Sequence, residues 1–95
     1  MTVDRARRLY GRHARRYDRL AAGYIEACAA ATIARIADAP CRVLDVGCGS
    51  GVLLVRLSAH LPAAELAGID ATAAMLDLAR ARLAPQVRVN EARAE

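Results

Sequence analysis

The stretch that decides the fold is a short apolar segment, three alternating glycines and a second apolar run. It reads Val43-Leu44-Asp45-Val46-Gly47-Cys48-Gly49-Ser50-Gly51 and continues as Val52-Leu53-Leu54-Val55. Residues 42–46 are rich in β-branched side chains and end at a glycine, which predicts a short buried strand. Residues 52–61 have helical length and stop at Pro62, which predicts a helix. Glycines between strand and helix permit a tight turn and let a ligand approach bare backbone.

The glycine spacing and the acid before it distinguish three kinds of ligand site. A P-loop requires Gly-Lys-Ser/Thr, and this chain contains no lysine. A dinucleotide fingerprint has the spacing Gly-x-Gly-x-x-Gly, whereas the spacing here is Gly-x-Gly-x-Gly, and Asp45 would lie against a pyrophosphate. S-adenosylmethionine carries no phosphate, and a carboxylate suits its ammonium and sulfonium groups while a helix N-terminus suits its carboxylate. This third ligand fits the residues best.

At this point the stretch resembles motif I of the class I S-adenosylmethionine-dependent methyltransferases, especially their small-molecule branch. Two later segments and one earlier segment are also similar to that family. Leu66-Ala67-Gly68-Ile69-Asp70 resembles its second strand, and Ala71-Thr72-Ala73-Ala74-Met75-Leu76-Asp77-Leu78-Ala79-Arg80 resembles the segment that follows. Tyr10, Ala14, Tyr17 and Asp18 match the spacing of its N-terminal helix, which covers the cofactor. The resemblance spans nearly the whole chain.

The resemblance implies a set of cofactor-binding residues. The three glycines would surround the methionine end of the cofactor, Asp45 would meet its ammonium group, and Asp70 would bind the ribose hydroxyls. Met75 would contact the adenine edge and Tyr17 would cover the cofactor. The complete implied set is Tyr17, Asp45, Gly47, Cys48, Gly49, Gly51, Asp70, Ala71 and Met75. No catalytic residue is assigned, because positioning alone supplies much of the catalysis of methyl transfer.

The order of elements predicts an α/β fold. Strands are expected near residues 42–46, 65–69 and 87–90, with helices at 52–61 and 72–83 between them. This alternation predicts right-handed parallel crossovers, the strand order 3-2-1 and a ligand at the carboxyl ends of the strands. The resemblance implies a Rossmann-like sheet truncated to about three strands. We expect one partial domain over residues 1–95, with two N-terminal helices in 1–39 and the cofactor-binding core in 40–95.

The N-terminal part predicts an amphipathic helix over residues 3–24, broken near Gly23, and a second helix over 25–37. Residues 1–20 hold seven arginines against two acids, a net charge of +5, whereas the rest of the chain carries −1. The arginines fall on the polar face of the first helix. One interpretation is a solvated face, and the other is a stripe that binds nucleic acid or an anionic membrane. The first is favoured because the apolar face carries tyrosines rather than Leu, Phe or Trp.

Composition excludes several classes of protein. No apolar stretch approaches the ~20 residues of a membrane span, so no membrane partner is expected. The N-terminus has no apolar signal core, so a cytoplasmic location is expected. The three cysteines, at positions 28, 41 and 48, are odd in number and lack Cys-x-x-Cys spacing, which argues against disulfides and against a metal site.

Two departures from the family pattern bear on activity. Arg93 stands where relatives carry an aspartate that accepts from the adenine amino group, and arginine cannot accept a hydrogen bond. The segments that would carry the pocket for the methyl acceptor are also absent from these 95 residues. We therefore expect the cofactor-binding half of a methyltransferase whose acceptor is unidentified. The alternative is a non-catalytic fragment that binds cofactor or self-associates through the open edge of the first strand.

Overall fold

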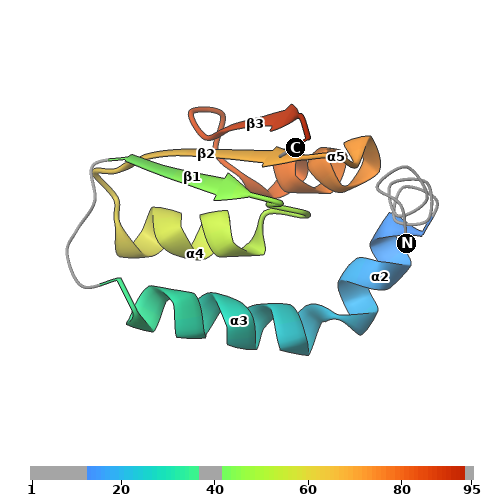
Figure 1. Cartoon of the computed structure of the whole chain (residues 1–95), viewed down its shortest axis with the longest axis horizontal. Coiled ribbons are helices and arrows are strands. Elements are labelled where there is room, and N and C mark those ends of the chain that lie inside the picture. Colours follow the sequence, from blue (N-terminus) through green and yellow to red (C-terminus); the bar gives the residue numbers. More distant parts are fainter. Residues whose placement is uncertain (1–12, 37–41, 94–95) are drawn as a thin grey trace.

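Three parallel strands and the helices that connect them form the centre of the protein (Figure 1). The structure, a computed structural model, describes residues 13–36 and 42–93. Figure 1 shows α4 between the sheet and α3, with α2 beside α5 at one end. In chain order, the elements are α2 (Ala14–Leu20), α3 (Ala22–Ala34), β1 (Arg42–Val46), α4 (Val52–His60), β2 (Glu65–Asp70), α5 (Ala73–Arg82) and β3 (Arg88–Glu91).

The sheet has the order β1-β2-β3, and both pairs of strands are parallel. β1 pairs with β2 from Arg42 opposite Glu65 to Val46 opposite Ile69, and β2 pairs with β3 as far as Asp70 opposite Glu91. The predicted strand order and the predicted α/β class are therefore confirmed. Because the strands are parallel, their carboxyl ends meet at one edge of the sheet, directly before the glycine turn and α5.

A single apolar core joins both crossover helices to the same face of the sheet. Leu54 and Leu57 of α4 and Leu76 of α5 are fully buried, and Leu66 and Val89 contribute from β2 and β3. Two successive right-handed crossovers that step in the same direction place both helices on one face. Burying a leucine of this kind stabilises the fold by about 1.5–3 kcal/mol relative to leaving it exposed.

The opposite face of β1 differs from the prediction of a buried strand. Leu44 is 58% exposed and Val46 is 54% exposed, whereas Val43 and Asp45 on the other face are partly buried. The prediction was wrong for this face because α4 and α5 both pack on the other side, and no described helix covers it. Within residues 13–36 and 42–93, β1 pairs only with β2, so self-association through its edge stays a prediction.

The break between the N-terminal helices lies at Ala21, and the prediction that Gly23 breaks the helix was wrong. Gly23 lies inside α3, where a Cβ atom would meet nothing within 4 Å. The two helices pack on different partners, since α2 contacts α5 while α3 runs along α4. The chain bends between the two helices because each packs against a different neighbour. The part of the predicted first helix before residue 13, including Tyr10, lies outside the described residues, as does Cys41.

Gly68 of β2 is the point at which the sheet approaches the glycine turn most closely. A Cβ atom at this position would lie 2.8 Å from Cys48 Cβ and 2.8 Å from Leu54 Cδ1. Real side chains do not tolerate such distances, so the turn or α4 would have to shift. The small residue before Ile69 and Asp70 therefore sets how near β2 lies to the turn.

We predict that Gly68→Ala destabilises the fold by about 1–3 kcal/mol, because it overpacks a filled interior. The matched control is Gly23→Ala, which adds the same methyl group inside a helix with free space and gains up to about 1 kcal/mol in helix propensity. Urea unfolding followed by circular dichroism measures both changes. Equal effects of the two substitutions would contradict the close approach at Gly68.

Candidate functional site

The turn between β1 and α4 is built on three glycines with positive φ. The φ angles are +77° at Gly47, +55° at Gly49 and +86° at Gly51. No other described residue has a positive φ, so the strained conformations are confined to this turn. L-residues with a Cβ atom rarely adopt this conformation, which explains the alternating glycines of the sequence.

The end of β2 holds the turn in place through backbone hydrogen bonds. Gly47 N and Cys48 N both donate to Ile69 O, at 2.8 Å and 3.0 Å. Gly51 N donates to Cys48 O at 3.0 Å. These three N–H groups already have backbone acceptors and are not available as donors to a ligand. The turn would therefore contribute mainly a surface without side chains that a ligand can approach closely. At Gly47, a Cβ atom would meet nothing within 4 Å, so the backbone there borders open space.

Asp70, the last residue of β2, joins the turn to the start of α5. Its Oδ2 accepts from Gly49 N at 2.9 Å, and its Oδ1 accepts from Thr72 N at 2.9 Å. An ionised carboxylate has about four lone-pair positions, and these two bonds use half of them. Each oxygen can therefore accept a further hydrogen bond, such as one from a ligand hydroxyl.

Asp45 lies near the carboxyl end of β1, at the same edge of the sheet as Asp70. Burial raises the pKa of Asp45 above its usual value, and the negative charge of Asp70 raises it further. A cation placed here would offset both effects. Burial also raises the pKa of the Cys48 thiol to about 11, with Asp70 and Asp45 adding to the shift. The thiol is thus neutral near pH 7, which argues against a nucleophilic role.

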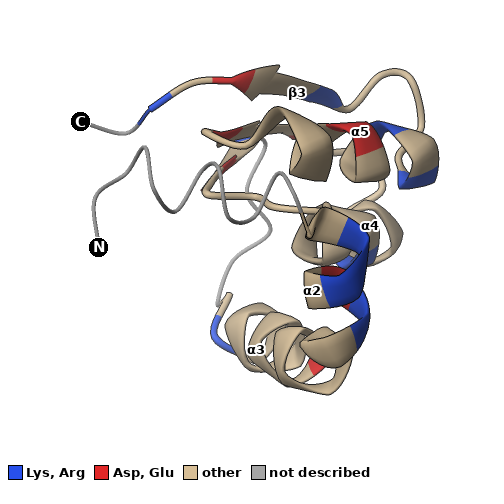
Figure 2. Ribbon diagram, turned by 90° about the vertical axis from the view of Figure 1, so that its right-hand side faces the viewer, with Lys and Arg blue, Asp and Glu red and all other residues tan. Residues whose placement is uncertain are grey.

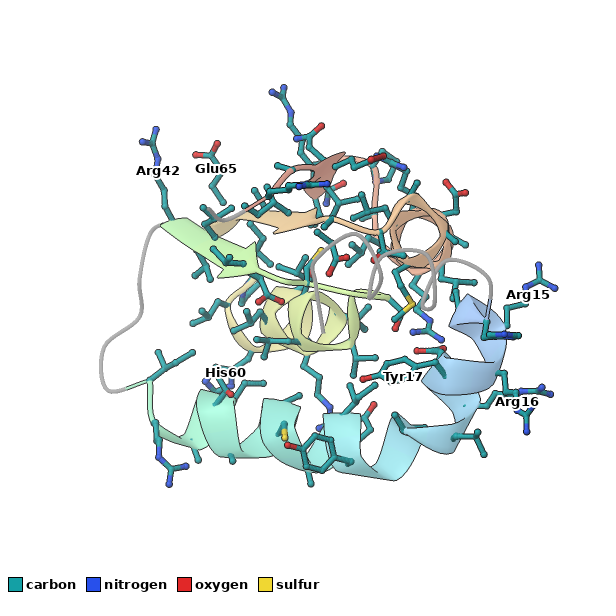
Figure 3. All side chains as sticks on the ribbon, turned by 45° about the vertical axis from the view of Figure 1, so that its right-hand side comes forward. Arg15, Arg16, Tyr17, Arg42, His60 and Glu65 are labelled. Carbon is teal, nitrogen blue, oxygen red and sulfur yellow. The ribbon has the colours of Figure 1, made fainter. Side chains whose placement is uncertain are left out.

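A cleft of about 250 Å³ opens beside the glycine turn, between β1, α2, α3 and α5. Tyr17 is 40% exposed and points inward from α2 (Figure 3). Tyr24, Ile25 and Cys28 of α3 also line the cleft, although the sequence did not indicate them. Six of the nine predicted residues line this cleft: Tyr17, Asp45, Gly47, Cys48, Gly49 and Met75.

The other three predicted residues lie beside the cleft or turn away from it. Asp70 ends β2 and adjoins the turn through its bond to Gly49, and Ala71 follows it directly. Gly51 packs against α5 instead, where a Cβ atom would lie 3.1 Å from Ala79 Cβ. Its role in the structure is to let α4 begin close to α5. Arg93 follows Ala92, whose N–H donates to Asp70 O at 3.0 Å, so the segment after β3 reaches the same edge of the sheet.

An ion pair that the sequence analysis did not predict, between a buried aspartate and an exposed arginine, ties α2 to the glycine turn. Asp18 of α2 forms a salt bridge with Arg82 of α5 and accepts a hydrogen bond from the hydroxyl of Ser50. Arg82 Nη1 also donates to Ser50 Oγ at 2.8 Å. The Arg82 guanidinium, with help from Ser50, lowers the pKa of Asp18 despite its burial. The signal in the sequence was the Tyr-Asp pair, of which only Tyr17 was considered.

A second contact fixes α3 against α4. Arg56 Nε donates to Glu26 Oε2 at 2.7 Å, and the pair forms a salt bridge. Both side chains are about half exposed, so the pair contributes less than about 1 kcal/mol. It nevertheless positions the helix whose Tyr24, Ile25 and Cys28 form one wall of the cleft.

Two negative findings concern the described residues alone. Within residues 13–36 and 42–93, no group of three or more His, Cys, Asp or Glu side chains is placed to hold a metal ion. No helix in that same part of the chain has the length and apolarity needed to cross a membrane.

The family is shown by comparison with known proteins. Residues 43–95, more than half of the chain, match the model of a methyltransferase domain family. The chain belongs to this family of class I S-adenosylmethionine-dependent methyltransferase domains. The matched stretch begins at Val43 in β1 and includes the glycine turn and Asp70, which are the residues that build the cleft and its edge.

Curated relatives differ in the acceptors that their names state. The chain is 45% identical over 56 residues to a trans-aconitate 2-methyltransferase of Methylobacterium radiotolerans, covering 58% of this chain and 22% of that protein. It is 49% identical over 43 residues to a ribosomal RNA small subunit methyltransferase C of Salmonella choleraesuis, covering 45% and 13%. It is 38% identical over 48 residues to a magnesium-protoporphyrin O-methyltransferase of Rhodobacter capsulatus, covering 50% and 20%. The matches thus span less than a quarter of each relative.

We predict that Asp18→Asn destabilises the protein by about 1.5–3 kcal/mol, because it removes a charge-assisted hydrogen-bond partner of Arg82 and Ser50. Asp77→Asn is the matched control, since Asp77 pairs with Arg80 of the same helix but is 78% exposed. We expect the control to change the free energy of unfolding by less than about 0.5 kcal/mol. Urea denaturation of both variants at pH 7 measures these changes. Similar small losses of unfolding free energy in the two variants would show that the ion pair of Asp18 contributes little to stability.

The stabilising effect of Asp18 depends on pH with a definite sign. Its pKa is lower in the folded state than the ordinary value of 3.8, so the stabilisation is fully present above that value and is lost as the pH falls through the folded-state pKa. The difference in unfolding free energy between the wild type and Asp18→Asn should therefore be constant near neutral pH and shrink in acid. Thermal melts at several pH values measure it, and a difference that grows as pH falls would contradict the sign.

Proposed function

We propose that this chain binds S-adenosylmethionine in the cleft beside the glycine turn and forms the cofactor-binding part of an enzyme that transfers its methyl group. The observation that carries the proposal is that Asp45 and Asp70 lie toward the carboxyl ends of two neighbouring parallel strands, beside a turn of positive-φ glycines to which Asp70 is hydrogen-bonded. The family membership supports the use of this cofactor in general terms. When bound, the cofactor supplies an electrophilic methyl group on a sulfonium.

The residues of the cleft fit the charges of this cofactor. Asp45 would accept from the ammonium group, and a cation at this point relieves the burial and like-charge repulsion that raise its pKa. Asp70 would accept from the ribose hydroxyls with the lone pairs that Gly49 and Thr72 leave unused. Met75 is buried and would pack on the adenine edge, while Tyr17 would lie over the bound cofactor. Cys48, Gly47 and Ala71 would shape the surrounding surface.

The protein's contribution to methyl transfer would be positioning. The glycine turn is held by three backbone bonds and by Asp70, so the cofactor would meet a surface that is already formed. Gly51 would act indirectly, by letting α4 begin against α5. We propose that residues 1–39, which include α2 and α3, form a unit that covers the cofactor, and that residues 40–95 form the cofactor-binding core.

A small molecule is the acceptor that we propose. The names of a trans-aconitate and a magnesium-protoporphyrin methyltransferase support this proposal, whereas the names of several other relatives state ribosomal RNA. The proposed location is the cytoplasm, where the enzyme would meet a small-molecule acceptor.

We predict that Asp70→Asn weakens the binding of S-adenosylhomocysteine by about tenfold or more, because neutralising the acceptor of two ribose hydroxyls removes about 1.5–3 kcal/mol. Met75→Ala trims part of one apolar contact and should weaken binding less. Isothermal titration calorimetry measures both, with circular dichroism to confirm that each variant is folded. Equal losses, or a larger loss for Met75→Ala, would contradict the role of Asp70.

A further inference from the structure

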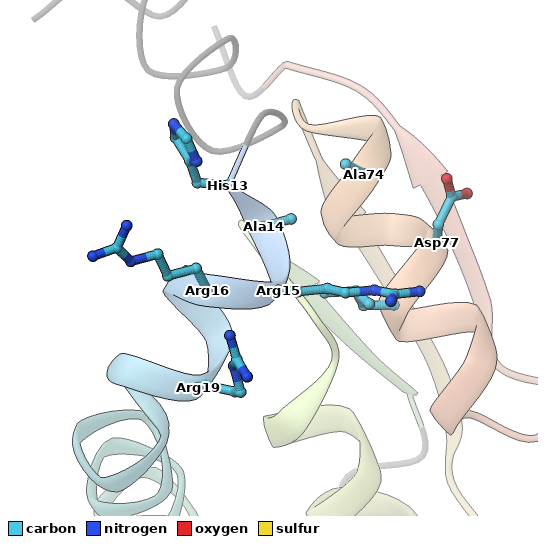
Figure 4. A pocket seen from close by; sticks show the side chains of 8 residues that line it. His13, Ala14, Arg15, Arg16, Arg19, Ala74 and Asp77 are labelled. Atoms are coloured by element: carbon cyan, nitrogen blue, oxygen red, sulfur yellow. The ribbon is translucent and has the colours of Figure 1, made fainter.

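A second cavity lies on the other side of α2, between this helix and α5, and it is strongly basic. Its volume is about 510 Å³, which is in the range of small-molecule pockets. Figure 4 shows Arg15 extending from α2 toward α5, on which Ala74 and Asp77 lie. The lining residues are His13, Ala14, Arg15, Arg16, Arg19, Ala74, Asp77 and Leu78. In Figure 2 the blue side of α2 marks its arginines.

The stability of α2 does not explain Arg15 and Arg16, whereas Arg19 lies in the last turn, where a positive charge favours the helix. Arg15 and Arg16 lie in the first turn of the helix, where a positive charge opposes the helix dipole. Arg15 and Arg19 are one turn apart on the same side, and like charges at this spacing destabilise a helix. Within the described part of the chain, none of the three forms an ion pair, since Asp18 pairs with Arg82 and Asp77 pairs with Arg80 at 3.5 Å. Arg15 and Arg16 thus carry charges that are unfavourable for α2 itself, which indicates that they bind a ligand.

We propose that this cavity binds a small molecule through its carboxylate or phosphate oxygens. Arginine suits such a group because its guanidinium offers a planar fork of donors and keeps its charge at every physiological pH. The cavity is concave, and its lining residues within 13–36 and 42–93 include no Phe, Tyr or Trp on which the bases of a nucleic-acid strand would stack. A compact oxyanion therefore fits better than a polynucleotide.

The same two helices line both the cavity and the cofactor cleft. α2 contributes Tyr17 to the cleft and Arg15 to the cavity, while α5 contributes Met75 to the cleft and Ala74 to the cavity. An oxyanion held by the arginines would thus lie one helix away from the proposed cofactor. We assign the cavity to the anionic end of the methyl acceptor, an assignment that rests on the proposed function.

Citrate, a compact tricarboxylate, is the probe for the test. We expect saturable binding of citrate to the 95-residue chain at low ionic strength, measured by calorimetry, and a loss of about tenfold or more in Arg15→Gln/Arg19→Gln. The control is Arg42→Gln/Arg88→Gln, which removes the same charge from exposed positions on the strands and should change affinity less than about threefold. Circular dichroism confirms that both variants are folded.

Several outcomes would overturn the proposal, and they differ from those that test the cofactor cleft. Absence of saturable citrate binding, or equal losses in the two double variants, contradicts the oxyanion site. An RNA oligonucleotide that binds more tightly than citrate and depends on the same arginines contradicts the small-molecule assignment. If citrate binds as expected but S-adenosylhomocysteine does not bind at all, the proposed function and the acceptor role fail while the anion cavity stands. Unchanged S-adenosylhomocysteine affinity in Arg15→Gln/Arg19→Gln supports two separate sites.

Discussion

The attachment of the glycine turn to the end of β2 is the interaction on which the rest of the structure depends. Ile69 O accepts two N–H groups of the turn, and the Asp70 carboxylate accepts a third from Gly49. The approach is possible because Gly68 has no Cβ atom to meet Cys48 or Leu54. The same bonds hold Asp70 beside the turn, at the edge of the sheet where β1 and Asp45 also end, so one local constraint fixes the start of α4 and the position of an acidic side chain beside the cleft.

The ion pair between Asp18 and Arg82 extends this arrangement to the N-terminal helices. Through the Ser50 hydroxyl, α2 is bonded directly to the glycine turn, and through Arg82 it is bonded to α5. Tyr17, which lines the cleft, is the neighbour of Asp18, so the ion pair also restrains the backbone that carries this aromatic ring. α2 is therefore coupled to the glycine turn and to α5, and loosening the pair would loosen both contacts.

The sequence predicted the parts of this structure that local patterns determine. The strand at residues 42–46 was placed with the observed bounds, the strand order was right, and six of nine predicted residues line one cleft. The patterns did not reveal which face of β1 is covered, because that depends on where α4 and α5 pack. They also missed the pair of Asp18 and Arg82, which are 64 residues apart, since only the tertiary fold brings them together.

The helix break shows the same limit on a smaller scale. Glycine propensity favoured Gly23, but the chain bends at Ala21, where α2 turns toward α5 and α3 turns along α4. Packing thus overrode a local preference of about 1 kcal/mol. At Gly47, Gly49 and Gly51 packing and propensity agree, because the positive φ angles of the turn favour glycine. Because packing and local propensity favour the same conformation at these glycines, the turn was the most predictable part of the chain.

Amide chemical shifts test most directly whether the cleft beside the glycine turn binds S-adenosylmethionine. Titrating the isotope-labelled chain with S-adenosylhomocysteine should give saturable shifts at Asp45, Gly47, Gly49, Asp70 and Met75. The residues of the exposed start of the sheet, such as Arg42 and Glu65 (Figure 3), should not shift. Shifts that do not saturate, or that are confined to residues away from the cleft, would contradict the claim.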